Sequence, residues 1–467
     1  MRNHIGNVRY RTENNKHFLP DVEKTAPPHQ AAKACQTCTV SSSRVLRIGL
    51  LGFGTVGSGV YRMLADNRES IEKKVGFPVE VVKIGVRDGS KPRELPSDLF
   101  TTDLGSIVDD PTIDVIIEVI GGTDPAGALV ERAIQNQKNV VTANKELMAK
   151  EGSRLVHMAK ARRLDLHYEA AVGGGIPLVQ PLKHQLAGNA VLKMMGILNG
   201  TTNYILTEMQ DKGADFGDVL ASAQALGYAE ADPTNDVDGF DTMYKMSILA
   251  SIAFGKQVPL ESIHREGIRA VTRTDMHYSD LLGYRIKLLG IVDAVAPDRI
   301  RARVHPTLLP KAHPLANVHG VYNALWLNGD FVGDLMFSGR GAGSDPTASA
   351  VIGDLIDVGR NLAAGGPGSA LPYDIGAKTE SIDSLQTRNY LRLIVQDRPR
   401  VLGTIALEFG EHGVSLAEME MKTLPEGRGE MVFLTHPATE SDFRAALTAV
   451  ENMPNVERVA NSFRVES

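Results

Sequence analysis

Short apolar runs alternate with helix-like segments along the first third of the chain. The runs cover residues 45–51, 79–86, 113–120 and 140–142, and glycines or polar residues follow each of them. An apolar run of this length is typical of a strand buried on both faces of a parallel sheet. Strands that alternate with helices predict βαβ units. We therefore expect an α/β fold whose first domain covers residues 44–172.

The pattern changes after this domain. Strand-like and helix-like runs are mixed over residues 173–339, which predicts an α+β domain. A glycine-rich turn then precedes an amphipathic helix over 348–362, and the polar residues 365–388 have the composition of a linker. Over residues 389–467 the order strand, helix, strand, strand, helix, strand predicts a small βαββαβ domain. The polar residues 1–43 lack an apolar period, so we expect a disordered leader.

A glycine-rich turn follows the first predicted strand at once. It is made of Gly52, Phe53, Gly54, Thr55, Val56 and Gly57. The first glycine permits the tight turn, the second lets backbone approach a pyrophosphate, and the third lets helix and strand pack closely. The N–H groups at the helix start then face the phosphates. With a strand before it and a helix after it, the turn favours a Rossmann-type dinucleotide-binding domain over a glycine turn without a ligand.

The second predicted strand ends in Arg87 and Asp88. An acid at this place binds the ribose hydroxyls of NAD, whereas an arginine suits the 2′-phosphate of NADP. Because Arg87 comes first and Lys91 and Arg93 follow, we favour NADP, and Asp88 leaves the use of NAD open. Ordinary solvated loop charges are the alternative, since a loop after a strand is polar in any case.

The stretch 227–245 combines an acid-rich turn with the start of a helix. Asp241 and Lys245 are four residues apart, so a helix would place them on one face. The apolar segment 246–254 follows, and we expect it to be buried. This combination predicts polar groups at the wall of a cavity. Spacing alone also allows an ordinary surface ion pair at a helix start.

This stretch resembles the signature segment of homoserine dehydrogenases. The family pattern runs Ala-x-x-x-Gly-Tyr, an acid, Asp-Pro-x-x-Asp, Gly-x-Asp and a final Lys. The chain matches it at Ala223, Gly227, Tyr228, Glu230, Asp232, Pro233, Asp236, Gly239, Asp241 and Lys245. The segments 144–146 and 196–204 also resemble those of the family. The resemblance implies hydride transfer with NAD(P) between L-homoserine and L-aspartate 4-semialdehyde, in the biosynthesis of threonine, methionine and isoleucine.

The resemblance also implies roles for single residues. Lys245 would pass a proton to or from the alcohol oxygen, and Lys145 would assist it or polarise the carbonyl. The expected substrate-binding residues are Glu230, Asp241, Gly227 and Asp236, the two named first holding the substrate ammonium. The expected cofactor-binding residues beyond the glycine turn are Arg87, Thr123, Lys145 and Gly343. Residues 340–364 would return the chain to the dinucleotide-binding domain and complete it.

A loop with three glycines, Gly173 to Gly175, follows the predicted strand at residue 166. Glycines free the backbone to aim carbonyl oxygens inward, and such oxygens bind hard cations. From the residues alone, a tight turn is the simpler explanation. The loop resembles a sodium site of the family, which would use the carbonyls of Glu169, Val172, Gly174 and Ile176.

The βαββαβ domain resembles an ACT domain, a regulatory amino-acid-binding module that works at a dimer interface. This resemblance implies threonine as a feedback ligand and a homodimer or homotetramer as the assembly. A structural, dimerising role without a ligand is the alternative. In the substrate domain we expect a sheet with helices on one face and the other face free for subunit pairing.

Composition narrows the remaining choices. A net charge of -6 and a pI of about 6.1 argue against nucleic acid or an anionic membrane as a partner, and without a signal or spanning segment we expect a cytoplasmic protein. The only cysteines, Cys35 and Cys38, precede the first strand. They are too few for a structural zinc site and badly placed for the nucleophile of a phosphorylating semialdehyde dehydrogenase. A non-enzymatic, nucleotide-sensing regulator is the alternative of another class.

Overall fold

The computed structural model describes residues 44–366, 372–374 and 376–466, so the expectations for residues 1–43, Cys35 and Cys38 included, lie outside the described chain. The first sheet has six parallel strands in the order β3-β2-β1-β4-β5-β6. The strands are β1 (Leu46–Leu51), β2 (Val79–Gly85), β3 (Phe100–Thr101), β4 (Val115–Glu118), β5 (Asn139–Thr142) and β6 (Leu166–His167). This is the strand order of a Rossmann fold, as the apolar runs and the glycine turn predicted.

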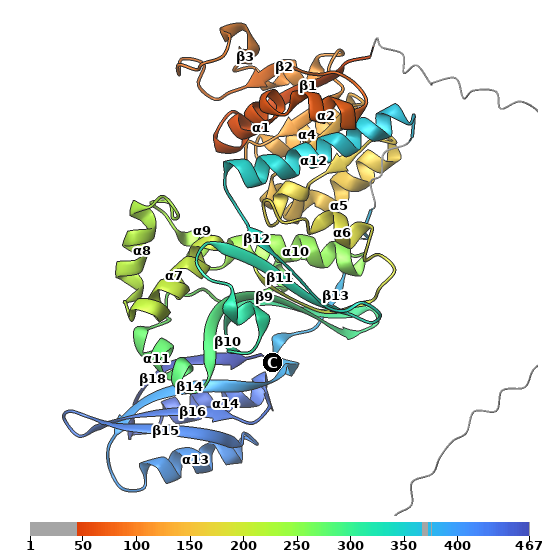
Figure 1. The fold of residues 1–467 in the computed structure, drawn as a ribbon. Coiled ribbons are helices and arrows are strands. Elements are labelled where there is room, and N and C mark those ends of the chain that lie inside the picture. Colours follow the sequence, from red (N-terminus) through yellow and green to blue (C-terminus); the bar gives the residue numbers. More distant parts are fainter. Residues whose placement is uncertain (1–43, 367–371, 375, 467) are drawn as a thin grey trace, which may run out of the picture. The chain divides into compact units, whose positions relative to one another are not determined.

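Helices cover both faces of this sheet because its strands are apolar on both sides. One face packs against α1 (Thr55–Asp66), α2 (Arg68–Val75) and α12 (Ser344–Ala363). The other packs against α3 (Leu104–Asp109), α4 (Ala126–Gln135) and α5 (Lys145–Ala161). Figure 1 shows α12, from late in the chain, beside α1 and α2. At its start, Ser344 donates from Oγ to the carbonyl of Thr55 at 2.9 Å.

The second sheet follows the path β12-β11-β7-β9-β10-β18-β14-β16-β15. Its first part consists of β7 (Val191–Ile197), β9 (Tyr284–Ala296), β10 (Arg299–Pro310), β11 (Tyr322–Gly329) and β12 (Gly333–Arg340). The accompanying helices are α6 (Val179–Lys183), α7 (Gly200–Lys212), α8 (Phe216–Ala225), α9 (Thr234–Val237), α10 (Phe240–Phe254) and α11 (Arg273–Leu281). The face away from the helices, which we expected to be free, carries a short helix over Pro314–Asn317 and a small apolar cluster around Met195 and Ile291.

The C-terminal residues form the predicted βαββαβ unit. Its elements are β14 (Gln386–Gln396), α13 (Val401–Glu411), β15 (Leu416–Leu424), β16 (Arg428–Thr435), α14 (Glu440–Glu451) and β18 (Val456–Val465). Part of the segment 365–388, which we expected to be a linker, forms strands: β13 (Lys378–Thr379) pairs with β10, and β14 begins at Gln386. Residues 367–371 and 375 of this segment lie outside the described chain. Within the described ranges, no helix combines the length and the apolar character that a membrane span requires.

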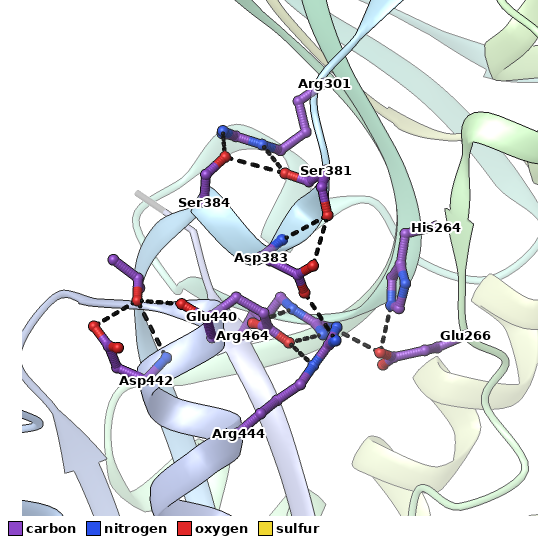
Figure 2. A network of polar contacts seen from close by, with 12 residues as sticks. His264, Glu266, Arg301, Ser381, Asp383, Ser384, Glu440, Asp442, Arg444 and Arg464 are labelled. Atoms are coloured by element: carbon purple, nitrogen blue, oxygen red, sulfur yellow. Dashed lines mark hydrogen bonds and ion pairs between the residues drawn. The ribbon is translucent and has the colours of Figure 1, made fainter. Parts of the chain in front are cut away.

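The C-terminal unit extends the second sheet. Strand β18 pairs in parallel with β10, with Thr307 opposite Arg464 and Leu308 opposite Val465. Figure 2 shows the polar contacts beside this junction: the buried Arg464 donates to Glu440 of α14 at 2.9 Å and to Glu266 at 2.9 Å. Glu440 belongs to the same unit as Arg464, so only the contact with Glu266 crosses the junction there, and the side chain of Glu266 is 40% exposed. The ion pair of Arg303 on β10 with Glu466 also crosses the junction and is buried on both sides. Because removing one partner of such a buried pair costs about 3–5 kcal/mol, charge as well as strand pairing holds the unit.

Candidate active site

Two lysines share one buried carboxylate at the start of α10. Lys245 Nζ lies 2.7 Å from Asp241 Oδ2 and also donates to the carbonyl of Leu198 at 2.7 Å. Lys145, the first residue of α5, forms an ion pair with the other oxygen, Oδ1. The side chains of Asp241 and Lys245 are 1% and 9% exposed. The spacing thus placed them correctly on one face, and the alternative of a surface ion pair is wrong.

Asn199 joins this group to a second acid. Its Nδ2 donates to Asp241 Oδ2 at 2.9 Å and to Asp236 Oδ1 at 2.7 Å. Its Oδ1 accepts the N–H of Thr202 at 2.8 Å and so caps α7. One asparagine therefore fixes the start of a helix and the orientation of two carboxylates. The sequence singled out its segment, 196–204, by the resemblance to the family, and the structure shows that Asn199 is a helix cap that also binds the acids.

The shared carboxylate makes the two lysines chemically different. Burial alone would raise the pKa of Asp241, but the ammonium groups of Lys245 and Lys145 hold it well below its ordinary value. Burial lowers the pKa of Lys245, and the charge of Lys145 lowers it further against the pull of Asp241. Asp241 raises the pKa of Lys145, whose side chain is 44% exposed. Lys145 therefore stays charged, whereas Lys245 releases its proton more readily than an ordinary lysine.

The remaining predicted substrate residues lie in the turn before α10. Glu230 is exposed, and its carboxylate makes no hydrogen bond or ion pair in the described part of the chain. Asp236 is half-buried, and burial together with the charge of Asp241 raises its pKa. Gly227 has a φ of 75°, which favours glycine there. Both oxygens of Asp241 are engaged by the chain itself, whereas the carboxylate of Glu230 and the second oxygen of Asp236 have no partner among the described residues and are open to a ligand.

The glycine turn has the shape that a pyrophosphate requires. A Cβ at Gly57 would lie 2.1 Å from the carbonyl oxygen of Gly52, so the third glycine is needed for close packing. A Cβ at Gly54 would meet nothing within 4 Å, so backbone faces open space there. Helix α1 begins at Thr55 with no side-chain cap and no acid in its first turn. Its free N–H groups and positive dipole end therefore fit a dinucleotide phosphate.

The loops after β4 and β5 are tied together beside this turn. Glu118, at the end of β4, accepts the N–H of Ile120 at 2.7 Å and the hydroxyl of Thr142 at 2.6 Å. Asn144 donates to the carbonyl of Gly122 at 2.6 Å and caps α5. Gly122 and Asn144 directly precede the predicted residues Thr123 and Lys145, so the loop that carries Thr123 lies against the start of α5. Gly343, with a φ of 120°, directly precedes the Ser344 that binds Thr55.

The two candidate ligands in the loop after β2 differ in their contacts. Asp88 Oδ1 accepts the N–H and the hydroxyl of Ser90 at 2.9 and 2.6 Å, so one of its two carboxylate oxygens is engaged within its own loop. Arg93 lies over the ring of Phe100 at 4.9 Å and donates to the carbonyl of Asp88 at 2.9 Å. Arg87 is exposed and makes no ion pair in the described ranges.

The glycine loop after β6 is held by a buried acid. Glu169 accepts the N–H groups of Leu178, Val179 and Gln180 at 2.6, 2.9 and 2.6 Å. Its own N–H donates to Asp354 of α12 at 2.8 Å, and burial raises the pKa of Asp354 to about 6. The expected strand is only two residues long, because this carboxylate turns the chain into α6. Asp354 lies far away in the sequence, and no local pattern marked it.

The loop also has free carbonyl groups. In the chain as described, the carbonyls of Val172, Gly174 and Ile176 accept no hydrogen bond, whereas that of Glu169 accepts the N–H of Val172 at 3.3 Å. No three His, Cys, Asp or Glu side chains of the described residues are grouped to hold a metal ion. A cation here would depend on these carbonyls.

Three family models match the chain. They are the NAD-binding domain of homoserine dehydrogenase over residues 52–169, homoserine dehydrogenase over 177–356 and the ACT domain over 389–455. The homoserine dehydrogenase of Synechocystis sp. is 44% identical over 435 residues, which cover 90% of this chain and 100% of that protein. The chain belongs to the homoserine dehydrogenase family. This decides against the nucleotide-sensing regulator and makes the chain an NAD(P)-dependent oxidoreductase.

Solved homoserine dehydrogenases share the fold. The crystal structure of one from Thiobacillus denitrificans matches with a TM-score of 0.86 and 42% identity, over 91% of this chain and 99% of that chain. A hyperthermophilic archaeal homoserine dehydrogenase, solved in complex with NADPH, is 27% identical with a TM-score of 0.58, over 68% of this chain and 98% of that chain.

Proposed function

We propose that this homoserine dehydrogenase interconverts L-homoserine and L-aspartate 4-semialdehyde with Lys245 as the proton-transfer group. The observation that carries the proposal is the buried carboxylate of Asp241 between Lys245 and Lys145. This carboxylate places together one lysine that releases its proton readily and one that stays charged. The first can transfer a proton to or from the oxygen of an alcohol or aldehyde, and the second can stabilise negative charge on that oxygen.

The residues divide the chemistry as follows. When bound, the nicotinamide accepts or supplies the hydride at the substrate carbon. In homoserine oxidation, neutral Lys245 takes the hydroxyl proton, and in the reverse direction its ammonium returns it. Lys145 stabilises negative charge on the same oxygen, and Asp241 holds both lysines in place. Glu230 binds the substrate ammonium through charge-assisted hydrogen bonds, with Gly227 and Asp236 in the same turn.

NADP is the proposed cofactor, because Arg87 is exposed and makes no ion pair with any described residue, whereas one oxygen of Asp88 is engaged with Ser90. The archaeal relative solved with NADPH supports this choice. We expect Arg87→Ser to lower kcat/KM for NADPH about tenfold or more, since a hydrogen bond to a charged group contributes about 1.5–3 kcal/mol. The absorbance of NADPH and NADH at equal semialdehyde concentration measures both rates. NADH is the internal control, and an equal loss with both cofactors would contradict the role of Arg87.

The carbonyls of Glu169, Val172, Gly174 and Ile176 are proposed to bind a monovalent cation, sodium in particular. Support comes from the three carbonyls without a hydrogen-bond donor and from the small glycine loop that carries them. Gly174 packs closely against residues 341–342, because a Cβ at Gly174 would lie 2.6 Å from the carbonyl carbon of Gly341. A cation bound to the loop would therefore hold the loop against these residues.

The ACT domain is proposed to bind threonine and to act on catalysis through α11. Arg392 of β14 donates to Asp275 of α11 at 2.7 Å and to Glu430 of β16 at 3.0 Å, and all three residues are buried. Helix α11 also contacts α7, which is capped by Asn199 of the candidate site. A cytoplasmic homodimer or homotetramer is proposed as well, and a monomer by light scattering would contradict it.

A further inference from the structure

Asn323 of β11 is a buried asparagine whose amide has no partner. The residue is 1% exposed, and neither its Nδ2 nor its Oδ1 forms a hydrogen bond anywhere in the described chain. Buried side-chain amides are almost always hydrogen-bonded, because each unpaired group has lost its water without compensation. The lack of partners at Asn323 therefore requires an explanation.

The amide stands where two parts of the active site meet. On one side it packs against Gly341: a Cβ there would lie 2.1 Å from Asn323 Nδ2. Gly341 belongs to residues 340–344, here called the crossing segment, which connects β12 to α12 and ends at the dinucleotide turn. On the other side, a Cβ at Gly200 would lie 3.5 Å from Asn323 Oδ1. Gly200 directly follows Asn199, which holds Asp241.

A neighbouring asparagine shows what a structural amide looks like here. Asn203 is 2% exposed and lies on α7, one turn after Asn199. Its Nδ2 lies 3.1, 3.0 and 3.1 Å from the carbonyls of Val318, Gly320 and Tyr322, and its Oδ1 accepts Lys287 at 3.0 Å. Both amides are equally buried, but only one is paired.

We propose that Asn323 is a positioning residue for hydride transfer, whose amide hydrogen-bonds the backbone of the crossing segment in the arrangement that the enzyme adopts during turnover. An unpaired amide favours any arrangement that gives it partners, so these hydrogen bonds stabilise the reacting arrangement and not the resting one. The lack of a Cβ at Gly341 is what lets the amide lie against the backbone of this segment. The crossing segment would then bring Gly343 and the glycine turn of the dinucleotide-binding domain toward Asn199 and Asp241.

The test compares the same substitution at the paired and the unpaired asparagine. Leucine has the branched shape of asparagine without its polar atoms. We expect Asn323→Leu to keep or raise the thermal midpoint of the enzyme without ligands, because it removes an unpaired buried amide. Its kcat should fall about tenfold, the value of one hydrogen bond made only in the reacting arrangement. The Kd for NADPH, measured by fluorescence titration, should stay within twofold.

Asn203→Leu is the control and should lower the thermal midpoint by several degrees. A similar loss of thermal midpoint in Asn323→Leu would show that Asn323 is structural and would overturn the proposal. So would a kcat equal to that of the wild type. If leucine crowds Gly341 and the variant does not fold, Asn323→Ala is compared with Asn203→Ala under the same criteria. Failure of Asn323→Ala to fold also overturns the proposal.

Discussion

Replacing Asp241 with asparagine removes the carboxylate that both active-site lysines share. The side chain keeps its size, but one of its two oxygens becomes an NH₂ group. Its Oδ2 now accepts from Lys245 at 2.7 Å and from Asn199 at 2.9 Å, and its Oδ1 faces Lys145. An asparagine side chain has one carbonyl oxygen, so it can accept hydrogen bonds on only one of these two sides. On the other side its NH₂ group would face a lysine ammonium, and both of these groups are donors.

The expected loss follows from burial and from the number of contacts. Removing one partner of a buried ion pair costs about 3–5 kcal/mol, or roughly two to four powers of ten in an equilibrium. The pair with Lys245 dominates, because its side chains are 9% and 1% exposed. In the pair with Lys145 the lysine side chain is 44% exposed, so this pair contributes less to the expected loss of free energy. General acid–base catalysis contributes about 10²–10⁴ in rate, so we expect kcat to fall at least about a hundredfold.

The assay is steady-state oxidation of NADPH with aspartate semialdehyde, together with a fluorescence titration of NADPH. The Kd for NADPH should be unchanged within threefold, since the role that we propose for Asp241 concerns the substrate and the lysines and not the cofactor. Asp238→Asn is the matched control, because Asp238 lies three residues earlier and pairs with Arg269 at 2.6 Å at the surface, with side chains 28% and 47% exposed. It should keep kcat within twofold. An Asp241→Asn variant with more than a tenth of the wild-type kcat would refute the reasoning.

Three further outcomes are expected. Lys145→Met removes a positive charge that lowers the pKa of Lys245, so the pKa of Lys245 should rise. Homoserine oxidation needs neutral Lys245 and should therefore begin at higher pH in this variant. Lys245→Met should abolish this limb of the pH–rate profile. An unshifted profile in Lys145→Met would be inconsistent with proton transfer by Lys245. Exchanging sodium for choline in the assay should lower kcat, and equal rates would argue against the cation. Threonine should inhibit the enzyme, and the variant Arg392→Met should be inhibited more weakly. In the absence of threonine, the kcat of this variant should stay within threefold of the wild type. A threonine dose–response curve identical to that of the wild type would disprove coupling through Arg392.

Features that depend on a few neighbouring residues were predictable from the sequence. The glycine turn after β1, the i, i+4 pair of Asp241 and Lys245 and the order of the βαββαβ unit all follow from local patterns. Element ends were less predictable. Strand β14 begins at Gln386, before the start at residue 389 that we expected for the C-terminal domain, because Gln386 pairs with Thr439 of β17 (Ala438–Thr439), a partner that no local pattern reveals.

Contacts between distant segments were not predictable. Lys145 meets Asp241 from another domain, Asn199 binds Asp236 across 37 positions, and Glu169 binds Asp354 across 185. The carbonyl of Leu198, which accepts from Lys245, leaves no mark on the side-chain pattern at all. The family resemblance supplied the predicted lysines and acids, but the hydrogen bonds by which Asn199 orients Asp236 and Asp241 required the structure. So did the amide of Asn323, which is unpaired within the described chain.

Two residues that are each unfavourable in their own surroundings, Lys145 and Asp241, form a pair in this site, and the charge of each offsets the cost of the other. Lys145 occupies the first position of α5, where the positive end of the helix dipole disfavours a cation. Asp241 is 1% exposed, where a carboxylate is costly unless it is paired. Placed together they become a stable pair, but two apolar residues would serve stability as well or better. Departures of this kind from local preference concentrate at functional sites. Catalysis, in which the pair keeps one lysine charged beside another that releases its proton, is therefore the better explanation of the arrangement.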